Sequence, residues 1–238
     1  MGKPKSIILC NLQNSGSSAI DPIFREYLAK YDYYTDWHIS PADDSQLLER
    51  LDAGSPIYAW LHIPNDPATL KKYQEIILRN DVVFILLHRD PRDAAISMAH
   101  DFSKQHSRAI DKRLVVNMLN VFVPLVKNLV KLLSCSQMSI CEVKFSEIKT
   151  DILSVLKLIF LKAEIDVDLD VLEKLIHQYS FESQTNLQRG TSDTVVVRSA
   201  YMLRKGIDGD WKQYFDEELE TLYAQNLQDE HLKLGYSL

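Results

Sequence analysis

The chain has 238 residues, 46% of them hydrophobic, and a net charge of −6. A chain of this size and composition is expected to fold as one globular domain over residues 1–238 and to bury roughly 70–75% of its unfolded surface. The acidic balance, without a basic tail or a cationic stripe, argues against a nucleic-acid partner and suits a small anionic ligand held by local clusters of cations.

The compartment can be inferred from the cysteines, the N-terminus and the longest apolar stretch. Cys10, Cys135 and Cys141 show neither zinc-site nor disulfide spacing, which predicts buried thiols in a reducing cytoplasm. The first five residues lead directly into a short apolar strand and lack the apolar region and cleavage site of a signal peptide. Asparagines and lysines interrupt the apolar stretch Leu114–Leu133, which is therefore expected to be a buried helix and not a membrane span.

Short apolar runs alternate with helical patterns along the chain, which predicts βαβ units and an α/β fold around a mainly parallel sheet. Strands are expected, in chain order, at Ser6–Leu12, Tyr34–Ile39, Pro56–Ile63, Val82–His88 and Met138–Phe145. Helices are expected near Ser18–Lys30, Ser45–Leu51, Pro67–Arg79, Pro91–Phe102, Leu114–Leu133, Ile148–Leu161, Leu169–Tyr179 and from Asp216 onward. The mostly polar segment Glu182–Ala200 is expected to be a mobile loop.

The first turn between a strand and a helix reads Asn-Leu-Gln-Asn-Ser-Gly-Ser-Ser over residues 11–18. Small, hydroxyl-bearing residues at this place offer backbone N–H groups and Ser hydroxyls to an anion at a helix N-terminus. The turn is not a Walker A motif, because it lacks that spacing and its lysine. As a bare pattern it is equally compatible with a helix capped by serine.

The turn after the fourth strand carries Arg89 and, two helical turns further on, Ser97. Arg89 follows a continuously apolar strand, at the carboxyl edge where doubly wound sheets bind ligands. Asp90 as an N-cap followed by Pro91 predicts the start of a helix. The alternative interpretation of this turn is a capped helix with a surface ion pair between Arg92 and Asp90 or Asp93.

His62 lies at the end of the third expected strand, in the sequence Trp-Leu-His-Ile-Pro. A single histidine at a strand end is more often structural than catalytic, although an imidazole can accept a proton near neutral pH. The remaining histidines show no metal-ligand spacing, so no metal is expected.

Near the C-terminus, residues 204–212 read Arg-Lys-Gly-Ile-Asp-Gly-Asp-Trp-Lys. The guanidinium of Arg204 and the ammonium of Lys205 together suit a phosphate group. Gly206 and Gly209 permit positive φ angles and close approach of backbone N–H groups to an anion. Taken alone, the segment is also compatible with a solvated turn, which is the less favoured interpretation.

This Arg-Lys-Gly segment closely resembles the C-terminal signature of sulfotransferases that use 3′-phosphoadenosine 5′-phosphosulfate (PAPS) and release adenosine 3′,5′-bisphosphate (PAP). The resemblance extends, in order, through the first turn, the His62 strand and the Arg89 turn. It implies a three-layer, P-loop-like α/β fold with a central, mainly parallel sheet flanked by helices. It also implies a PAPS co-substrate and a PAP product.

By the same resemblance, Ser15, Gly16, Ser17 and Ser18 would hold the 5′-phosphosulfate. Asn14 stands where the family places a lysine or arginine that contacts the bridging oxygen, and an amide cannot supply that positive charge. Losing such a charge partner commonly lowers the rate by ~10²–10³-fold.

The resemblance makes His62 the general base, with Trp60 in place of a second family lysine. Asn14 and His62 are thus the two positions at which the family carries out its chemistry. The two departures at Asn14 and Trp60 leave open a second possibility, a PAP-binding protein that has lost catalysis. A nucleotide kinase is a third possibility, against which the missing Walker lysine argues.

The 3′-phosphate would be held by residues from two segments, namely Arg89, Ser97, Arg204, Lys205 and Gly206. Phe181 resembles the family aromatic that packs on adenine. Phe145 stands where the family often has a tyrosine, so a hydroxyl contact to the nucleotide would be absent. The family's dimerisation sequence is not found after Lys212, which leaves the oligomeric state open.

Together these features imply a cytoplasmic sulfotransferase of secondary metabolism that acts on a hydroxyl or an amine of a small-molecule acceptor. The acceptor itself cannot be read from the sequence. Its pocket is expected to involve four variable segments, Asp36–Asp44, Pro64–Thr69, Phe102–Asp111 and Glu182–Ala200.

Overall fold

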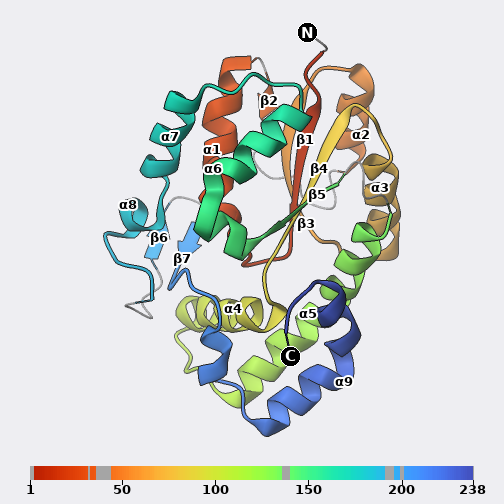
Figure 1. The fold of residues 1–238 in the computed structure, drawn as a ribbon. Coiled ribbons are helices and arrows are strands. Elements are labelled where there is room, and N and C mark those ends of the chain that lie inside the picture. Colours follow the sequence, from red (N-terminus) through yellow and green to blue (C-terminus); the bar gives the residue numbers. More distant parts are fainter. Residues whose placement is uncertain are drawn as a thin grey trace.

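A five-stranded, entirely parallel sheet forms the centre of the computed structural model (Figure 1). The structure describes residues 3–31, 33–35, 44–135, 140–190, 196–198 and 201–237. The strand order is β2-β3-β1-β4-β5. The strands are β1 (Ser6–Asn11), β2 (Tyr34–Thr35), β3 (Ile57–His62), β4 (Val82–His88) and β5 (Ile140–Lys144).

The two central strands are buried along their whole length because helices cover both faces of the sheet. Side chains alternate between the faces of a strand. Ile7 and Leu9 of β1 accordingly belong to the core on one face, and Ile8 and Cys10 to the core on the other. This burial explains why β1 and β4 read as continuous apolar runs.

Helices on both faces complete the three layers. One face is covered by α1 (Ser17–Leu28), α6 (Phe145–Lys162) and α7 (Leu169–Gln178). The other is covered by α2 (Asp44–Ala53), α3 (Pro67–Ile77), α4 (Pro91–His106), α5 (Lys112–Leu133) and α9 (Glu217–Lys233). In Figure 1, α4, α5 and α9 extend beyond the sheet at the carboxyl ends of its strands. The predicted α/β fold with a flanked parallel sheet is confirmed.

Most predicted elements occur within a few residues of their expected bounds, and the differences have local causes. Helix α4 continues past Phe102 to His106 and ends at Ser107, which adopts a left-handed conformation with φ 50°. The second strand contains Tyr34–Thr35, and the rest of its expected range lies outside the described residues.

The expectation of an irregular loop over Glu182–Ala200 was wrong in part. Ser180 caps a short helix, α8 (Phe181–Thr185), by accepting a hydrogen bond from the Ser183 N–H at 3.2 Å. Two further strands, β6 (Val196–Arg198) and β7 (Tyr201–Leu203), pair antiparallel. Residues 191–195 and 199–200 lie outside the described part of the chain.

Helix α5 is the one helix of the described residues that is long and apolar enough to cross a membrane. Its most apolar 18-residue window has a mean hydropathy of 1.4, and half of that window is buried inside the protein. The buried face includes Phe122, Val126 and Leu129, which belong to the same core as α4 and α9. Length and composition alone do not distinguish such a core helix from a membrane span.

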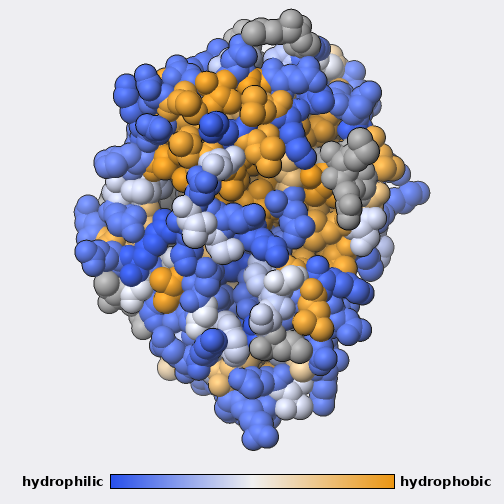
Figure 2. All heavy atoms as spheres, in the orientation of Figure 1, coloured by the Kyte–Doolittle hydropathy of each residue, from blue (hydrophilic) through white to orange (hydrophobic). Residues whose placement is uncertain are grey.

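The surface shown in Figure 2 divides into two regions. Hydrophobic atoms gather over the upper half of the view, where α6 crosses the sheet in Figure 1. Helix α6 exposes Leu158 and Leu161, at 55% and 63%. The lower half, over α4, α5 and α9, is mostly hydrophilic.

The C-terminal tail is bound to the start of α4 by a buried polar network. Arg92 donates a hydrogen bond to the Ser237 carbonyl at 2.6 Å and forms an ion pair with Asp90 at 2.7 Å. Fully buried His231 lies 2.9 Å from the same carbonyl through Nε2 and 2.8 Å from the Tyr223 hydroxyl through Nδ1. The Arg92 guanidinium lies 3.1 Å from the same Nε2 and opposes a second positive charge on the ring. The Arg92–Asp90 pair is therefore part of the interior and not a surface pair.

This network predicts that unfolding depends on pH through His231. Burial lowers the pKa of His231 below its ordinary value of 6.5. The unfolded chain therefore binds this proton at a higher pH, so the stabilisation is complete above pH 6.5 and decreases as the pH falls below it. We expect the free energy of unfolding in urea to decrease between pH 7.5 and 5.5 by more in the wild type than in His231→Gln. The difference cannot exceed about 1.4 kcal/mol per pH unit for one proton. Equal slopes for the two proteins would show that His231 is not buried in its neutral form.

Candidate active site

A cavity of about 410 Å³ lies at the carboxyl edge of the sheet. Strands β1, β3, β4 and β5 each place a lining residue at or just after their carboxyl ends, because parallel strands present these ends at one edge of the sheet. The residues singled out in the sequence that line it are Asn14, Gly16, Ser17, Ser18, His62, Arg89, Ser97, Phe181, Arg204, Lys205 and Gly206. Five separate segments of the chain thus meet at one cavity.

The turn after β1 combines a tight backbone with an open helix start. Gly16 has φ 94°, and a Cβ atom there would lie 2.5 Å from Cδ2 of Phe145, so that only glycine fits. Gly16 is also the N-cap of α1 and supplies no capping side chain. The N–H groups of the first turn, at Ser17 and Ser18, are therefore placed beside the cavity as donors for an anion.

Ser15 differs from its neighbours in this turn. Its hydroxyl is fully buried, has no hydrogen-bond partner among the described residues, and does not line the cavity. Any contribution of Ser15 to ligand binding would therefore come from its backbone.

The Arg-Lys-Gly segment contains a buried ionic cluster. Arg204 donates to Asp210 at 2.6 Å, and Lys205 donates to the other oxygen of the same carboxylate at 2.9 Å. Asp210 is only 1% exposed. Burial raises its pKa, but the hydrogen bonds from Lys205 and Arg204 outweigh this and hold the pKa below its usual value. One buried carboxylate thus orients two cations toward the cavity.

Asp93 connects this segment to the turn after β4. Its carboxylate accepts hydrogen bonds from the backbone N–H groups of Gly209 at 2.7 Å and Trp211 at 2.9 Å. Arg89 lies 3.9 Å from Asp93 and donates to the carbonyl of Ile207 in the same loop. These contacts hold Arg89 beside Arg204 and Lys205, although the two segments are far apart in the sequence.

The combined cluster contains three buried cations, Arg89, Arg204 and Lys205, and two buried carboxylates, Asp93 and Asp210. Arg89 also lies 3.9 Å from the partly exposed Asp208. Burial lowers the pKa of Arg89, and the nearby Arg204 lowers it further. An anion bound here would stabilise all three cations, since a net charge out of water is costly unless it is compensated.

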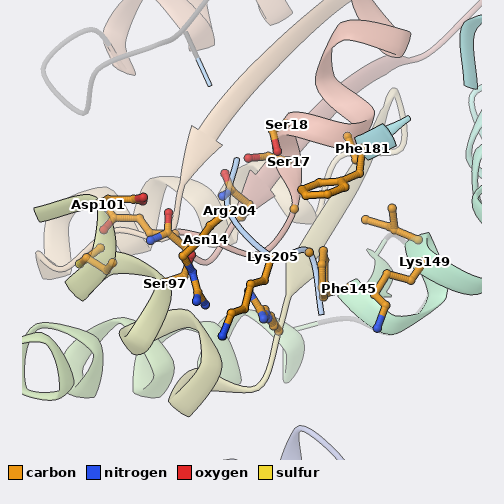
Figure 3. Close-up of a pocket in the computed structure, with 18 of the residues that line it drawn as sticks. Asn14, Ser17, Ser18, Ser97, Asp101, Phe145, Lys149, Phe181, Arg204 and Lys205 are labelled. Carbon is orange, nitrogen blue, oxygen red and sulfur yellow. The ribbon is translucent and has the colours of Figure 1, made fainter. Parts of the chain in front are cut away.

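Two phenylalanines form the opposite side of the cavity from Asp101 (Figure 3). The Phe145 ring lies 4.6 Å below the Arg89 guanidinium. The Phe181 ring lies close to Gly206, where an added Cβ would be 3.3 Å from its Cδ2 atom. Lys149 of α6 also lines this side and pairs with Asp208 at 2.9 Å. Flat apolar rings beside a cationic cluster suit a planar base attached to phosphate groups.

His62 lies at the end of β3, half-buried, and lines the same cavity. The register pairs it with Asn11 of β1. Trp60, two residues earlier, donates from Nε1 to the Asn11 side-chain oxygen at 2.6 Å, and its ring centroid is 5.5 Å from that of His62. Trp60 is thus part of the cavity wall and fixes Asn11, but it brings no charge.

The structure adds residues that the sequence did not single out. Asp101 and Lys149 line the cavity, and Asp210 organises its cations. Asp101 lies one helical turn after Ser97, so helical spacing from Ser97 was a usable signal. The described residues contain no cluster of three or more metal-ligating side chains.

The expected acceptor segments contribute unequally. Phe102 and Gln105 line the cavity from the last turns of α4, and Arg189 lines it from the chain after α8. No residue of Pro64–Thr69 is among the lining residues. Residues 36–43 lie outside the described part of the chain.

Comparisons with known proteins agree with this geometry. The chain resembles the crystal structure of mouse sulfotransferase SULT7A1 complexed with PAP, with a TM-score of 0.66 and 19% identity over 98% of this chain and 89% of that one. It also resembles retinol dehydratase in complex with androsterone and inactive cofactor PAP, with a TM-score of 0.59 and 16% identity over 97% and 81% of the two chains. These similarities show the fold.

A sequence search of curated proteins found no match. The model of the sulfotransferase domain family, in contrast, matches residues 4–234, which is nearly the whole chain. The chain therefore belongs to the sulfotransferase domain family.

Proposed function

We propose that this protein transfers a sulfuryl group from PAPS to a hydroxyl or an amine of a small-molecule acceptor and releases PAP, within a single domain over residues 1–238. The observation that carries the proposal is the buried cluster of Arg89, Arg204 and Lys205 at one cavity with the α1 N-terminus and His62. A cluster of three buried cations, together with a separate anion site at a helix N-terminus, fits a nucleotide with phosphate groups at two positions. The PAP complexes of the structural neighbours support this ligand.

The donor would be held at both of its ends. The first turn of α1, at Gly16, Ser17 and Ser18, would bind the 5′-phosphosulfate, with Ser15 contributing its backbone alone. Arg89, Ser97, Arg204, Lys205 and Gly206 would bind the 3′-phosphate. Phe181 and Phe145 would contact the adenine. The three buried cations and the helix N-terminus at Gly16, which has no capping side chain, fit such a ligand.

In the reaction, the acceptor oxygen or nitrogen attacks sulfur and forms the new bond. The bond from sulfur to the bridging oxygen breaks, and its electron pair leaves with PAP. His62 would take the proton of the attacking group, which prevents positive charge from accumulating on it. By analogy with phosphoryl transfer, positioning and charge complementarity would supply most of the rate acceleration.

At positions 14 and 60, this chain lacks the cations that the family places near the leaving group. An amide at Asn14 would donate a hydrogen bond to the bridging oxygen without compensating its charge. This difference supports a slow enzyme, and in the extreme case a PAP-binding protein without turnover. A nucleotide kinase is disfavoured because the turn after β1 has no Walker lysine.

The acceptor would enter beside α4, where Met98, Phe102 and Gln105 line the cavity. The modest volume of about 410 Å³ favours a small molecule over a polymer. We further propose a cytoplasmic location. The support is that the cysteines show neither zinc-site nor disulfide spacing, and all three are free thiols in the structure.

The function is tested by calorimetric titration with PAP and with ADP, which lacks the 3′-phosphate. We expect PAP to bind roughly 10- to 100-fold more tightly than ADP, because charge-assisted hydrogen bonds to the 3′-phosphate are worth roughly 1.5–3 kcal/mol each. Transfer of labelled sulfate from PAPS to a panel of phenols, alcohols and amines would then separate the enzyme from the inactive binding protein. Equal affinity for PAP and ADP would rule out the proposed nucleotide site.

A further inference from the structure

Asp101 is a buried carboxyl group in the cavity that the proposed reaction does not use. It belongs to α4, one turn beyond Ser97, and is only 9% exposed. In Figure 3 it lies on the side of the cavity opposite Phe145 and Phe181, next to Asn14. Nδ2 of Asn14 is buried and has no hydrogen-bond partner among the described residues, so an unused amide donor lies beside Asp101. Asp101 is therefore the neighbour of the residue that replaces the family's leaving-group cation.

The charges around Asp101 do not fully compensate a carboxylate. Arg204, from the loop after β7, is the charged group that acts on it. Burial raises the pKa of Asp101 to about 6, and the neighbouring Asn14 amide and Arg204 guanidinium lower it only in part. The other titratable side chains that line the cavity are His62, Arg89, Lys149, Tyr179, Arg189 and Lys205. An anionic donor in the same cavity would disfavour the Asp101 carboxylate further, since like charges oppose ionisation.

The protonation state of Asp101 decides which end of the Asn14 amide is available. A carboxylate only accepts hydrogen bonds, so it would engage Nδ2 of Asn14. A neutral acid donates, so it would engage Oδ1 instead and leave both Nδ2 protons for a ligand. The side-chain amide of Asn14 stands where the family has a cation. The protonation state of Asp101 controls how this amide is oriented.

We propose that Asp101 is a positioning residue that takes up a proton when the donor nucleotide binds and, as a neutral acid, turns the amide N–H₂ group of Asn14 toward the 5′-phosphate. The inference rests on the proposed PAPS and PAP site. In this proposal, Asp101 and Asn14 together supply a hydrogen-bond donor at the place where the family has a cation. It also implies that nucleotide binding weakens as the pH rises above neutrality.

The test compares PAP binding by the wild type and Asp101→Asn between pH 6 and 8. An asparagine at this position can donate to Asn14 Oδ1 at every pH and therefore imitates the neutral acid. We expect the ratio of the wild-type Kd to the Asp101→Asn Kd to rise about fivefold or more across this range. Proton binding to PAP itself and to His62 affects the two Kd values alike, so it cancels in their ratio.

A second readout is the proton count. Titrations at pH 7.5 in two buffers with different ionisation heats should show up to about one more proton taken up by the wild type than by Asp101→Asn. If Asp101→Asn unfolds, Asp101→Ser supplies a smaller neutral donor for the same comparison. A constant Kd ratio together with equal proton uptake would overturn the role of Asp101 and leave the proposed function intact. Failure of both proteins to bind PAP at every pH would instead overturn the proposed function.

Discussion

Replacing His62 with alanine is expected to lower kcat about 10²–10⁴-fold, the usual contribution of a positioned general base. The imidazole lies at the end of β3, half-buried, and lines the cavity with the α1 N-terminus and the cationic cluster. The cluster itself comes from other elements, after β4 and β7. The Kd for PAP should therefore change less than about threefold. Transfer of labelled sulfate and calorimetric PAP binding measure the two effects separately.

His177→Ala is the matched control for this experiment. His177 is exposed near the end of α7 and does not line the cavity. Its removal should leave both kcat and PAP affinity unchanged. If His62→Ala retained wild-type turnover, His62 would be a structural histidine and a different group would accept the proton. If His62→Ala lost PAP binding as well, the ring would be needed for the shape of the cavity.

The sequence was informative where one local rule determined the outcome. Val82–His88 was predicted with correct bounds because six consecutive apolar residues, followed by Asp90 and Pro91, specify a buried strand and a helix start. The edge of the sheet that carries the site followed from the same rule, since ligands bind at carboxyl ends of parallel strands. His62, Arg89 and the turn after β1 all lie at that edge.

Other features required contacts between distant segments, which a single sequence does not specify. The alternative interpretation of the Arg89 turn placed Asp93 in a surface pair, yet Asp93 is buried and binds the backbone of Gly209 and Trp211. The proximity of Asp101 to Asn14 depends on how α4 crosses the end of β1. The polar composition of Glu182–Ala200 concealed α8, because Ser180 and Glu182 are good residues for a helix start as well as for a loop.

Replacing Arg204 with alanine is expected to weaken PAP binding roughly 10- to 100-fold, because charge-assisted hydrogen bonds are worth roughly 1.5–3 kcal/mol each. The guanidinium is buried, and Asp210 fixes its direction at 2.6 Å. ADP lacks the phosphate that this group would contact, so its affinity should change less than about threefold. The preference for PAP over ADP should therefore disappear. Calorimetric titration of both nucleotides measures this directly.

Two further variants separate charge from geometry at this position. Arg204→Lys keeps the charge but loses the planar fork, so it should fall between the wild type and Arg204→Ala in PAP affinity. Lys212→Ala removes an exposed cation of the same segment that does not line the cavity, so it should bind PAP as the wild type does. An unchanged preference for PAP in Arg204→Ala would place the 3′-phosphate elsewhere. A specific site depends on the buried, oriented cation and not on the net charge of the segment. If Lys212→Ala lost as much PAP affinity as Arg204→Ala, general surface charge would be what attracts the nucleotide.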